Sequence, residues 1–407
     1  MTSTRNARRQ AAPRHASRQR RHPLARVAAV AGVGVAAFVL SGGALAYSSL
    51  QGNITRHDVT ELLGGERPAT EAPPADPRAG RPLNVLVMGS DVRSGENAQL
   101  GGAPETEGMR SDTTLLVHIS ADRSRADIVS IPRDLLVDIP ACALSDGSTS
   151  QAQPNTMFNA AFDTGGAGGR VEYAAACTIK TVEQMSGVFV DDYVVVDFAG
   201  FTRMVDALGG IPMCIPEPVS DRYAGLDLDA GQQVLAGQDA LAYARARKNL
   251  GDGSDISRIS RQQLLLGAMV RTVLSKNLLT DLPALYQFLD AATGSVTAGP
   301  TIGRIPNLIG LANSLRTVPA GGVTFVTLPF DWAGARVAPN EDSAALWASI
   351  AADERIAPAV APEPADTPTS DSTDTPDDDP TSPTSTPSPT SQPWDFVTGE
   401  DRGGVCG

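Results

Sequence analysis

The sequence predicts an α/β domain over residues 83–353, built as a sheet with helices on both faces. Short apolar runs typical of buried strands alternate with longer segments whose apolar residues recur at helical spacing. Such alternation favours a sheet sandwiched between helices. The predicted strands are 83–89, 114–119, 126–131, 193–198 and 323–327, and the predicted helices are 172–185, 201–208, 237–244 and 257–275.

Each element follows from its local sequence. The first strand is an apolar run that ends in Gly89, and the next two are separated by the polar segment 120–125, which indicates a turn. The helix at 201–208 is closed by Gly209 and Gly210, a common signal for a helix end. The helix at 257–275 carries one apolar stripe that should face the core, namely Ile259, Leu266, Met269 and Val273.

The N-terminal part predicts a single membrane anchor. Residues 1–26 contain no acid and eight arginines (Arg5, Arg8, Arg9, Arg14, Arg18, Arg20, Arg21 and Arg26). Residues 27–47 contain no charged side chain, which is enough for a helix to cross a bilayer. The positive-inside rule therefore predicts a cytoplasmic basic tail at 1–26, an anchor at 27–48 and an extracytoplasmic remainder. The alternative is a cleaved signal peptide whose cleavage site would fall at 43–46.

The remaining segments flank the domain. Residues 49–82 are polar and without periodicity, which indicates a stalk. Residues 354–393 are rich in Pro, Ser, Thr and Asp, so they cannot bury enough apolar surface to fold and should form a disordered linker. Residues 394–407 form a C-terminal segment that we expect to fold back. Outside the basic tail the formal charge is −21 (−13 minus 8), which argues against nucleic acid as a partner.

The four cysteines indicate two disulfides and an oxidising compartment. Their wide spacing, without a Cys-x-x-Cys, argues against a zinc site. We expect Cys142 to pair with Cys177, which would close the polar loop between them, and Cys214 to pair with Cys406. Pairing of Cys406 with Cys142 or Cys177 is the alternative, because nothing in the spacing excludes it.

Charged residues gather where the predicted strands end. Asp91 follows the first strand, Arg110 and Asp112 precede the second, and Arg133 and Asp134 follow the third. Loops at strand ends are where α/β sheets usually bind ligands. Any one of these residues could instead be an ordinary solvated loop residue. Their repetition at three strand ends favours a site.

Further arginines follow in the two central helices. Arg258 and Gln262 share a face at the first turn of the helix 257–275, where free N–H groups favour anions. Side chains two residues apart point to different sides of a helix but to the same side of an extended strand. Arg245 and Arg247 can therefore converge on one ligand only if the preceding helix ends before Arg245. Guanidinium groups suit phosphate oxygens. The alternative is a set of salt bridges to Asp252 and Asp255.

Histidine chemistry is not expected at this site. His118 lies mid-strand and is interpreted as structural. A general base would therefore be a carboxylate.

Five segments together resemble the LytR-CpsA-Psr family, in its actinobacterial form. They are NVLVMGSD (84–91), RSDTTLLVHI (110–119), SIPRDLLVDIP (130–140), VDALGGIPMCIP (205–216) and GQDALAYARARKNLGDGSDISRISRQQ (237–263). The resemblance implies a single α/β/α sandwich with a mixed central sheet. It also implies a Mg²⁺-dependent phosphotransferase that moves a glycopolymer from a polyprenyl-pyrophosphate carrier to peptidoglycan, forming a phosphodiester linkage.

The resemblance also implies residue roles. Asp91 and Asp112 match the magnesium carboxylates of the family, and the pyrophosphate binders are matched by Arg133, Arg245, Arg247, Arg258 and Gln262. Arg110 and Arg261 match motif positions that we also assign to pyrophosphate binding. Arg133, Arg245 and Arg247 would stabilise the leaving phosphate, while Asp91, Asp134 or a metal-bound water would accept the proton of the acceptor hydroxyl. The loop 92–109 is longer than is usual in the family.

Two other functions remain open from the sequence. One is a hydrolase that uses water on the same lipid pyrophosphate, and the other is a non-catalytic protein that binds the cell wall. The charged residues at the strand ends argue against the second. The expected partners are the lipid-linked glycopolymer, peptidoglycan and the membrane, and the sequence leaves the oligomeric state open.

Overall fold

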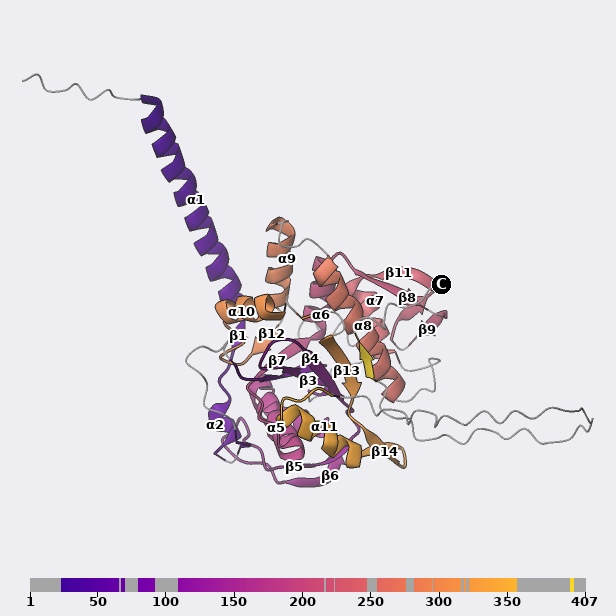
Figure 1. Cartoon of the computed structure of the whole chain (residues 1–407). Helices are drawn as coiled ribbons and strands as arrows, with labels where there is room; N and C mark the ends of the chain where they lie inside the picture. Colours follow the sequence, from indigo (N-terminus) through magenta and orange to yellow (C-terminus); the bar gives the residue numbers. More distant parts are fainter. Residues whose placement is uncertain are drawn as a thin grey trace, which may run out of the picture. The chain divides into compact units, whose positions relative to one another are not determined.

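The structure, a computed structural model, describes 23–65, 67–69, 80–91, 109–215, 217–222, 224–246, 255–275, 282–294, 296–315, 318–319, 322–356 and 396–398. It divides into two compact units, of which the first ends at Ser49 and the second begins at Leu50. The second unit holds the sheet (Figure 1).

An eight-stranded mixed sheet forms the centre of the second unit. Its spatial order is β1-β12-β7-β2-β3-β4-β13-β16. Pairing is parallel between β1 and β12, β7 and β2, and β4 and β13, and antiparallel elsewhere. The strands are β1 (Thr55–Arg56), β2 (Leu83–Ser90), β3 (Ser111–Ile119), β4 (Ala126–Ile131), β7 (Asp192–Asp197), β12 (Val296–Ala298), β13 (Val323–Thr327) and β16 (Phe396–Thr398). The predicted mixed sheet is confirmed.

Helices cover both faces of this sheet, with α5 and α11 on one side and α6, α7 and α8 on the other (Figure 1). The predicted α/β/α sandwich is therefore confirmed. The described helices of the second unit are α2 (Thr60–Leu63), α4 (Ala160–Gly165), α5 (Val171–Ser186), α6 (Phe198–Ala207), α7 (Gly237–Arg245), α8 (Asp255–Ser275), α9 (Leu282–Thr293), α10 (Ile305–Leu315) and α11 (Glu341–Ala351). A short 3₁₀ turn, Gly166–Gly168, joins α4 to α5.

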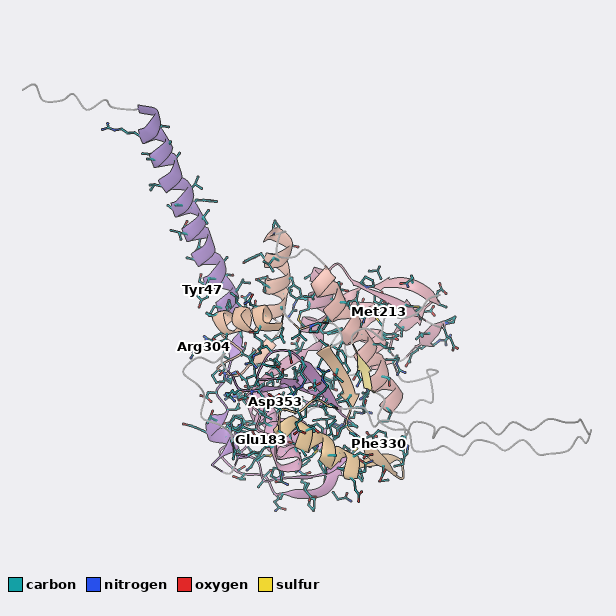
Figure 2. The ribbon with its side chains drawn as sticks, in the orientation of Figure 1. Tyr47, Glu183, Met213, Arg304, Phe330 and Asp353 are labelled. Atoms are coloured by element: carbon teal, nitrogen blue, oxygen red, sulfur yellow. A yellow bond between two sulfur atoms is a disulfide. The ribbon has the colours of Figure 1, made fainter. Side chains whose placement is uncertain are left out.

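Two hydrophobic clusters hold the layers together. The larger one packs Leu86, Met88 and Leu116 of the sheet against α5 residues such as Ile179. The smaller one joins α6, α7 and α8 to short antiparallel strand pairs, and Met213, labelled in Figure 2, belongs to it. The additional strand pairs of the domain are β5–β6 (Leu136–Ile139 and Gln153–Met157), β8–β11 (Ile211–Ile215 and Gly231–Leu235), β9–β10 (Val219–Asp221 and Leu226–Leu228) and β14–β15 (Phe330–Ala333 and Arg336–Pro339).

The helix α1 (Pro23–Asn53) contains the predicted membrane anchor. Within the described residues it is the one helix that is long and apolar enough to cross a membrane, over Arg26–Asn53. Its apolar side chains are exposed, with Phe38 78% and Leu40 73% accessible. This exposure separates α1 from an apolar helix buried in a protein core.

The start of the segment predicted as a stalk, 49–82, contributes to the folded domain. Its two short elements are β1, which pairs with β12, and α2, whose Leu63 is buried in the larger cluster together with Val59. Arg67 donates three hydrogen bonds to the Glu183 carboxylate of α5. The apolar positions in this stretch are too few to show a periodicity in the sequence, yet they are enough to attach it to α5.

Two observations concern the cysteines and the C-terminal segment. The predicted disulfide between Cys142 and Cys177 is confirmed. Cys214 is also disulfide-bonded, whereas Cys406, its predicted partner, lies outside the described residues. The three residues of β16 pair antiparallel with β13, in agreement with the expectation that the C-terminal segment folds back.

Candidate functional site

The first part of the site lies where β2 ends and β3 begins. Because the two strands are antiparallel, with Ser90 opposite Ser111, the residues that follow and precede them face each other. The Asp91 N–H donates to the Arg110 carbonyl at 3.0 Å, and the Arg110 N–H donates to Asp91 Oδ1 at 2.8 Å. Asp91 is buried and Arg110 is exposed. The carboxylate of Asp91 is thus fixed by the backbone, while the Arg110 side chain is left at the surface.

The second part joins Asp112 to Arg133. Thr114 of β3 is paired with Ile131 of β4, so the same antiparallel register brings Arg133 opposite Asp112. The Arg133 Nη1 donates to Asp112 Oδ1 at 2.7 Å. The backbone carbonyl of Arg133 accepts from the Asn159 N–H at 3.0 Å, which fixes the chain at this point. Both charged side chains remain partly exposed, and a ligand can reach them.

The third part is supplied by the N-terminal half of α8. Arg258, only 3% exposed, donates through Nη2 to the backbone carbonyl of Asp112 at 3.0 Å. One turn later Gln263 donates to Ser130 Oγ at 3.0 Å and to Thr327 Oγ1 at 3.1 Å. These bonds connect α8 to the ends of β4 and β13. Two guanidinium groups, those of Arg133 and Arg258, therefore meet at Asp112.

Two predicted phosphate binders on α8 instead bond to the end of α7. Arg261 donates through Nη2 to the Ala246 carbonyl, and Gln262 donates through Nε2 to the Ala244 carbonyl at 3.1 Å. These carbonyls belong to the last turn of a helix, where backbone acceptors lack intrahelical partners. Arg261 and Gln262 thereby hold α7 and α8 together in this structure.

Arg245 is the last residue of α7, and its guanidinium carbon lies 4.7 Å from the centre of the Phe198 ring. The helix therefore ends at Arg245 rather than before it, and the chain becomes extended at Ala246 (φ −58°, ψ 136°). The approach of α6 and α7 requires Gly237, because a Cβ at that position would collide with the Thr202 carbonyl oxygen. Close packing of the two helices thus brings Arg245 over Phe198.

The predicted residues consequently form two groups at one end of the sheet. Arg133 and Arg258 each contact Asp112, and Asp91 contacts Arg110. Asp134 is half-buried beside Arg133. Arg247 lies outside the described residues. Sequence reasoning gave no role to Gln263, although it stands beside Gln262, or to Phe198, which follows a strand directly.

Asp91 and Asp112 are the candidate ligands for a magnesium ion. No group of three His, Cys, Asp or Glu residues suited to a metal occurs in the described part of the chain. Mg²⁺, however, is commonly held by one or two carboxylates, with phosphate oxygens and waters as the other ligands. Two carboxylates at neighbouring strand ends, with arginines beside them to hold phosphate, fit an ion of that kind.

Comparison with known proteins identifies the family. The model of the LytR_cpsA_psr family matches residues 46–353, most of the chain and all of its sheet except β16. The chain belongs to the LytR-CpsA-Psr family. All five segments on which the resemblance was based lie inside the matched range, as do Asp91, Asp112, Arg133 and Arg258.

Individual relatives agree with this membership. Cell wall biosynthesis protein LcpA of Corynebacterium glutamicum is 30% identical over 341 residues, which cover 77% of this chain and 61% of LcpA. The polyisoprenyl-teichoic acid–peptidoglycan teichoic acid transferase TagU of Halalkalibacterium halodurans is 29% identical over 260 residues, covering 63% of this chain and 74% of TagU. The chain thus spans less than two thirds of LcpA.

A solved structure supports the fold. The LytR-Csp2A-Psr enzyme from Actinomyces oris aligns with a TM-score of 0.51 at 25% identity, covering 73% of this chain and 96% of that one. The LytR-CpsA-Psr fold is therefore shared over nearly the whole length of the actinobacterial structure.

Proposed function

We propose that this LytR-CpsA-Psr protein is a phosphotransferase that moves a glycopolymer from a polyprenyl-pyrophosphate carrier to peptidoglycan outside the membrane. The observation that carries the proposal is the meeting of Arg133 and Arg258 at Asp112. The printed names of the relatives, a cell wall biosynthesis protein and a teichoic acid transferase, support the same class of reaction.

The reaction exchanges one phosphorus–oxygen bond for another. The hydroxyl oxygen of a peptidoglycan sugar forms a bond to the phosphorus nearest the glycopolymer. The bond from that phosphorus to the bridging oxygen breaks, and polyprenyl phosphate leaves. The hydroxyl proton passes to a carboxylate, for which Asp134 and Asp91 are the candidates.

Negative charge accumulates on the leaving phosphate, and fixed cations stabilise it. Arg133 is partly exposed, so it can turn from Asp112 towards the pyrophosphate. Arg258 is buried and bonded to the Asp112 carbonyl, so it offers a charge that needs no reorganisation. Arg245, stacked on Phe198, and Arg110, at the surface, are further phosphate contacts in this proposal. Arg247 is assigned the same role from the sequence alone.

The proposed metal is Mg²⁺, held by Asp91 and Asp112. When bound, it would neutralise part of the pyrophosphate charge. In the described structure Asp112 is neutralised by Arg133 instead. We infer that Asp112 would hold the metal when it is bound, which would leave Arg133 available to the substrate.

The anchor fits this assignment, because a lipid-linked substrate stays at the membrane. A domain tethered by α1 needs to search only the membrane surface for its donor. The arginine-rich tail at 1–26 supports an orientation with the domain outside the cytoplasm.

The test uses the full chain in proteoliposomes with a polyprenyl-pyrophosphate-linked oligosaccharide and peptidoglycan. The expected products are polyprenyl phosphate and oligosaccharide joined to peptidoglycan. Arg133→Ala should lower the rate about a hundredfold or more, whereas Arg336→Ala, an exposed arginine of β15, should leave it unchanged. Release of the lipid phosphate without transfer to peptidoglycan would identify a hydrolase and refute the proposal.

A further inference from the structure

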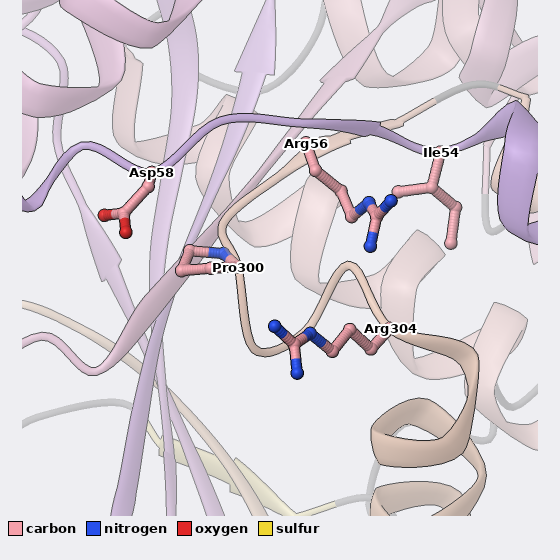
Figure 3. Close-up of a pocket in the computed structure, with 5 residues that line it drawn as sticks. All are labelled: Ile54, Arg56, Asp58, Pro300 and Arg304. Atoms are coloured by element: carbon pink, nitrogen blue, oxygen red, sulfur yellow. The ribbon is translucent and has the colours of Figure 1, made fainter.

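A pocket lies on the domain directly after α1, separate from the site at the strand ends. It is lined by Ile54, Arg56, Asp58, Pro300 and Arg304 and has a volume of about 340 Å³ (Figure 3). Two segments far apart in the sequence form it: the residues that follow α1, and the loop between β12 and α10. The sequence indicated a stalk for the first segment and assigned no binding role to either.

The pocket carries a net positive charge. Arg56 and Arg304 are both exposed, and neither forms an ion pair with another described residue. The single acid, Asp58, is engaged elsewhere: its Oδ1 accepts from the Thr60 hydroxyl at 2.6 Å and from the Thr60 N–H at 3.0 Å. Its carboxylate points away from the two guanidinium groups (Figure 3). Two arginines are thus available to an anion that enters the pocket.

An apolar helix begins beside these arginines. The sequence of α10, IPNLIGLANSL, contains no charged residue, yet no residue of this helix is buried. Ile309 is 63% exposed. An uncharged helix with an exposed apolar side chain on a protein surface can pack against an apolar neighbour outside the chain. Arg304, which immediately precedes α10, is labelled in Figure 2.

Covalent connection keeps this surface close to the membrane. Gln51 donates to the Gly303 carbonyl at 2.9 Å and accepts from the Ile305 N–H at 3.0 Å, which ties the start of α10 to the end of α1. Gln51 follows Tyr47, near the end of the predicted anchor at 27–48, by four residues. Even a fully extended chain of four residues spans no more than about 14 Å. The headgroup layer on one side of a bilayer is about 5–7 Å thick.

We propose that Arg56 and Arg304 bind the phosphate of an anionic phospholipid headgroup while α10 lies against the outer surface of the same membrane. The chemistry is that of interfacial helices, which combine a buried apolar face with basic residues at the headgroups. Gly303 assists because a Cβ there would lie 2.6 Å from Arg56 Cγ, so glycine leaves room for the arginine stem. The contact would orient the domain on the membrane, and it does not depend on the proposed transfer reaction.

The test measures amide hydrogen exchange of 305–315 in the full chain, inserted in nanodiscs of phosphatidylcholine with or without phosphatidylglycerol. Exchange should be slower with phosphatidylglycerol. Each arginine attracted to an anionic surface contributes about 1 kcal/mol, or about fivefold, so the pair accounts for up to about thirtyfold. Arg56→Gln and Arg304→Gln should each lower the phosphatidylglycerol-dependent protection about fivefold. The double variant should abolish it. Arg336→Gln should change nothing.

Three outcomes overturn the proposal. The first is equal exchange of these amides in both kinds of nanodisc. The second is phosphatidylglycerol-dependent protection that survives in the double variant. The third is equal protection by inorganic phosphate in detergent micelles, which would identify a site for a soluble anion. Since none of the three involves transfer to peptidoglycan, failure here is distinguishable from failure of the proposed function.

Discussion

The substitution Arg258→Lys tests whether the buried arginine acts through its geometry or only through its charge. Arg258 is 3% exposed and donates from Nη2 to the Asp112 carbonyl at 3.0 Å. Lysine keeps the positive charge but lacks the planar fork that can hold a carbonyl and a phosphate in one arrangement. A hydrogen bond from a charged group contributes about 1.5–3 kcal/mol, which corresponds to a loss of about tenfold to a hundredfold in transfer rate.

The assay is release of polyprenyl phosphate in the presence of peptidoglycan, with thermal unfolding in detergent as a check on folding. Arg271→Lys is the matched control, because Arg271 lies on the same helix 13 residues further on (271 minus 258), about 20 Å along its axis. The control should transfer at the wild-type rate. A turnover of the Arg258→Lys variant within threefold of wild type, or an equal loss in both variants, would refute the assignment of Arg258 to the phosphate site.

Three other outcomes follow from the structure. Chelation by EDTA should suppress transfer, and Asp112→Asn should weaken Mg²⁺ binding measured by calorimetry; undiminished activity in EDTA would contradict the metal assignment. Replacing Cys142 and Cys177 by Ala should lower the free energy of unfolding by about 4 kcal/mol, since their separation is 35 residues; urea denaturation measures it. Burial lowers the pKa of His118, against the opposing effect of Asp353. The unfolded chain therefore binds more protons at mildly acidic pH, so stability should fall below pH 6.5, and His118→Gln should flatten this dependence.

Long apolar runs allowed the centre of the fold to be predicted. The predicted strands 126–131 and 323–327 coincide with β4 and β13, and the helix 172–185 differs from α5 by one residue at each end. The edge strands β1 and β16 have two and three residues, too few for an alternating pattern to appear in the sequence. Their pairing depends on partners distant in the sequence.

The stripe predicted for α8 was partly wrong. Leu266 and Met269 are half-buried, whereas Leu265 and Ala268 are buried in the smaller cluster. The reason is that α8 is covered on two sides: Gln263 bonds to the sheet strands, while other side chains pack on α7 and β8. A single apolar stripe assumes one buried face.

The site could be predicted from the sequence where strand pairing alone determines which residues are neighbours. Asp112 and Arg133 flank paired antiparallel strands, so their sequence positions already imply that they are neighbours. For Arg261 and Gln262, motif spacing indicates a helix face but not the carbonyls of Ala246 and Ala244 that they contact. These contacts depend on how α7 packs on α8, and a local sequence pattern does not show how two helices pack.

The pairing of β16 with β13 has a consequence for handling the protein. Without residues 396–398, the edge of Val323–Thr327 would present unpaired N–H and carbonyl groups along an uncharged segment rich in β-branched residues. Such an edge is a template for pairing between molecules. A chain cut at 356 to remove the proline-rich stretch should therefore aggregate at concentrations where the full chain stays dispersed. Supplying the missing strand as a peptide should restore its solubility.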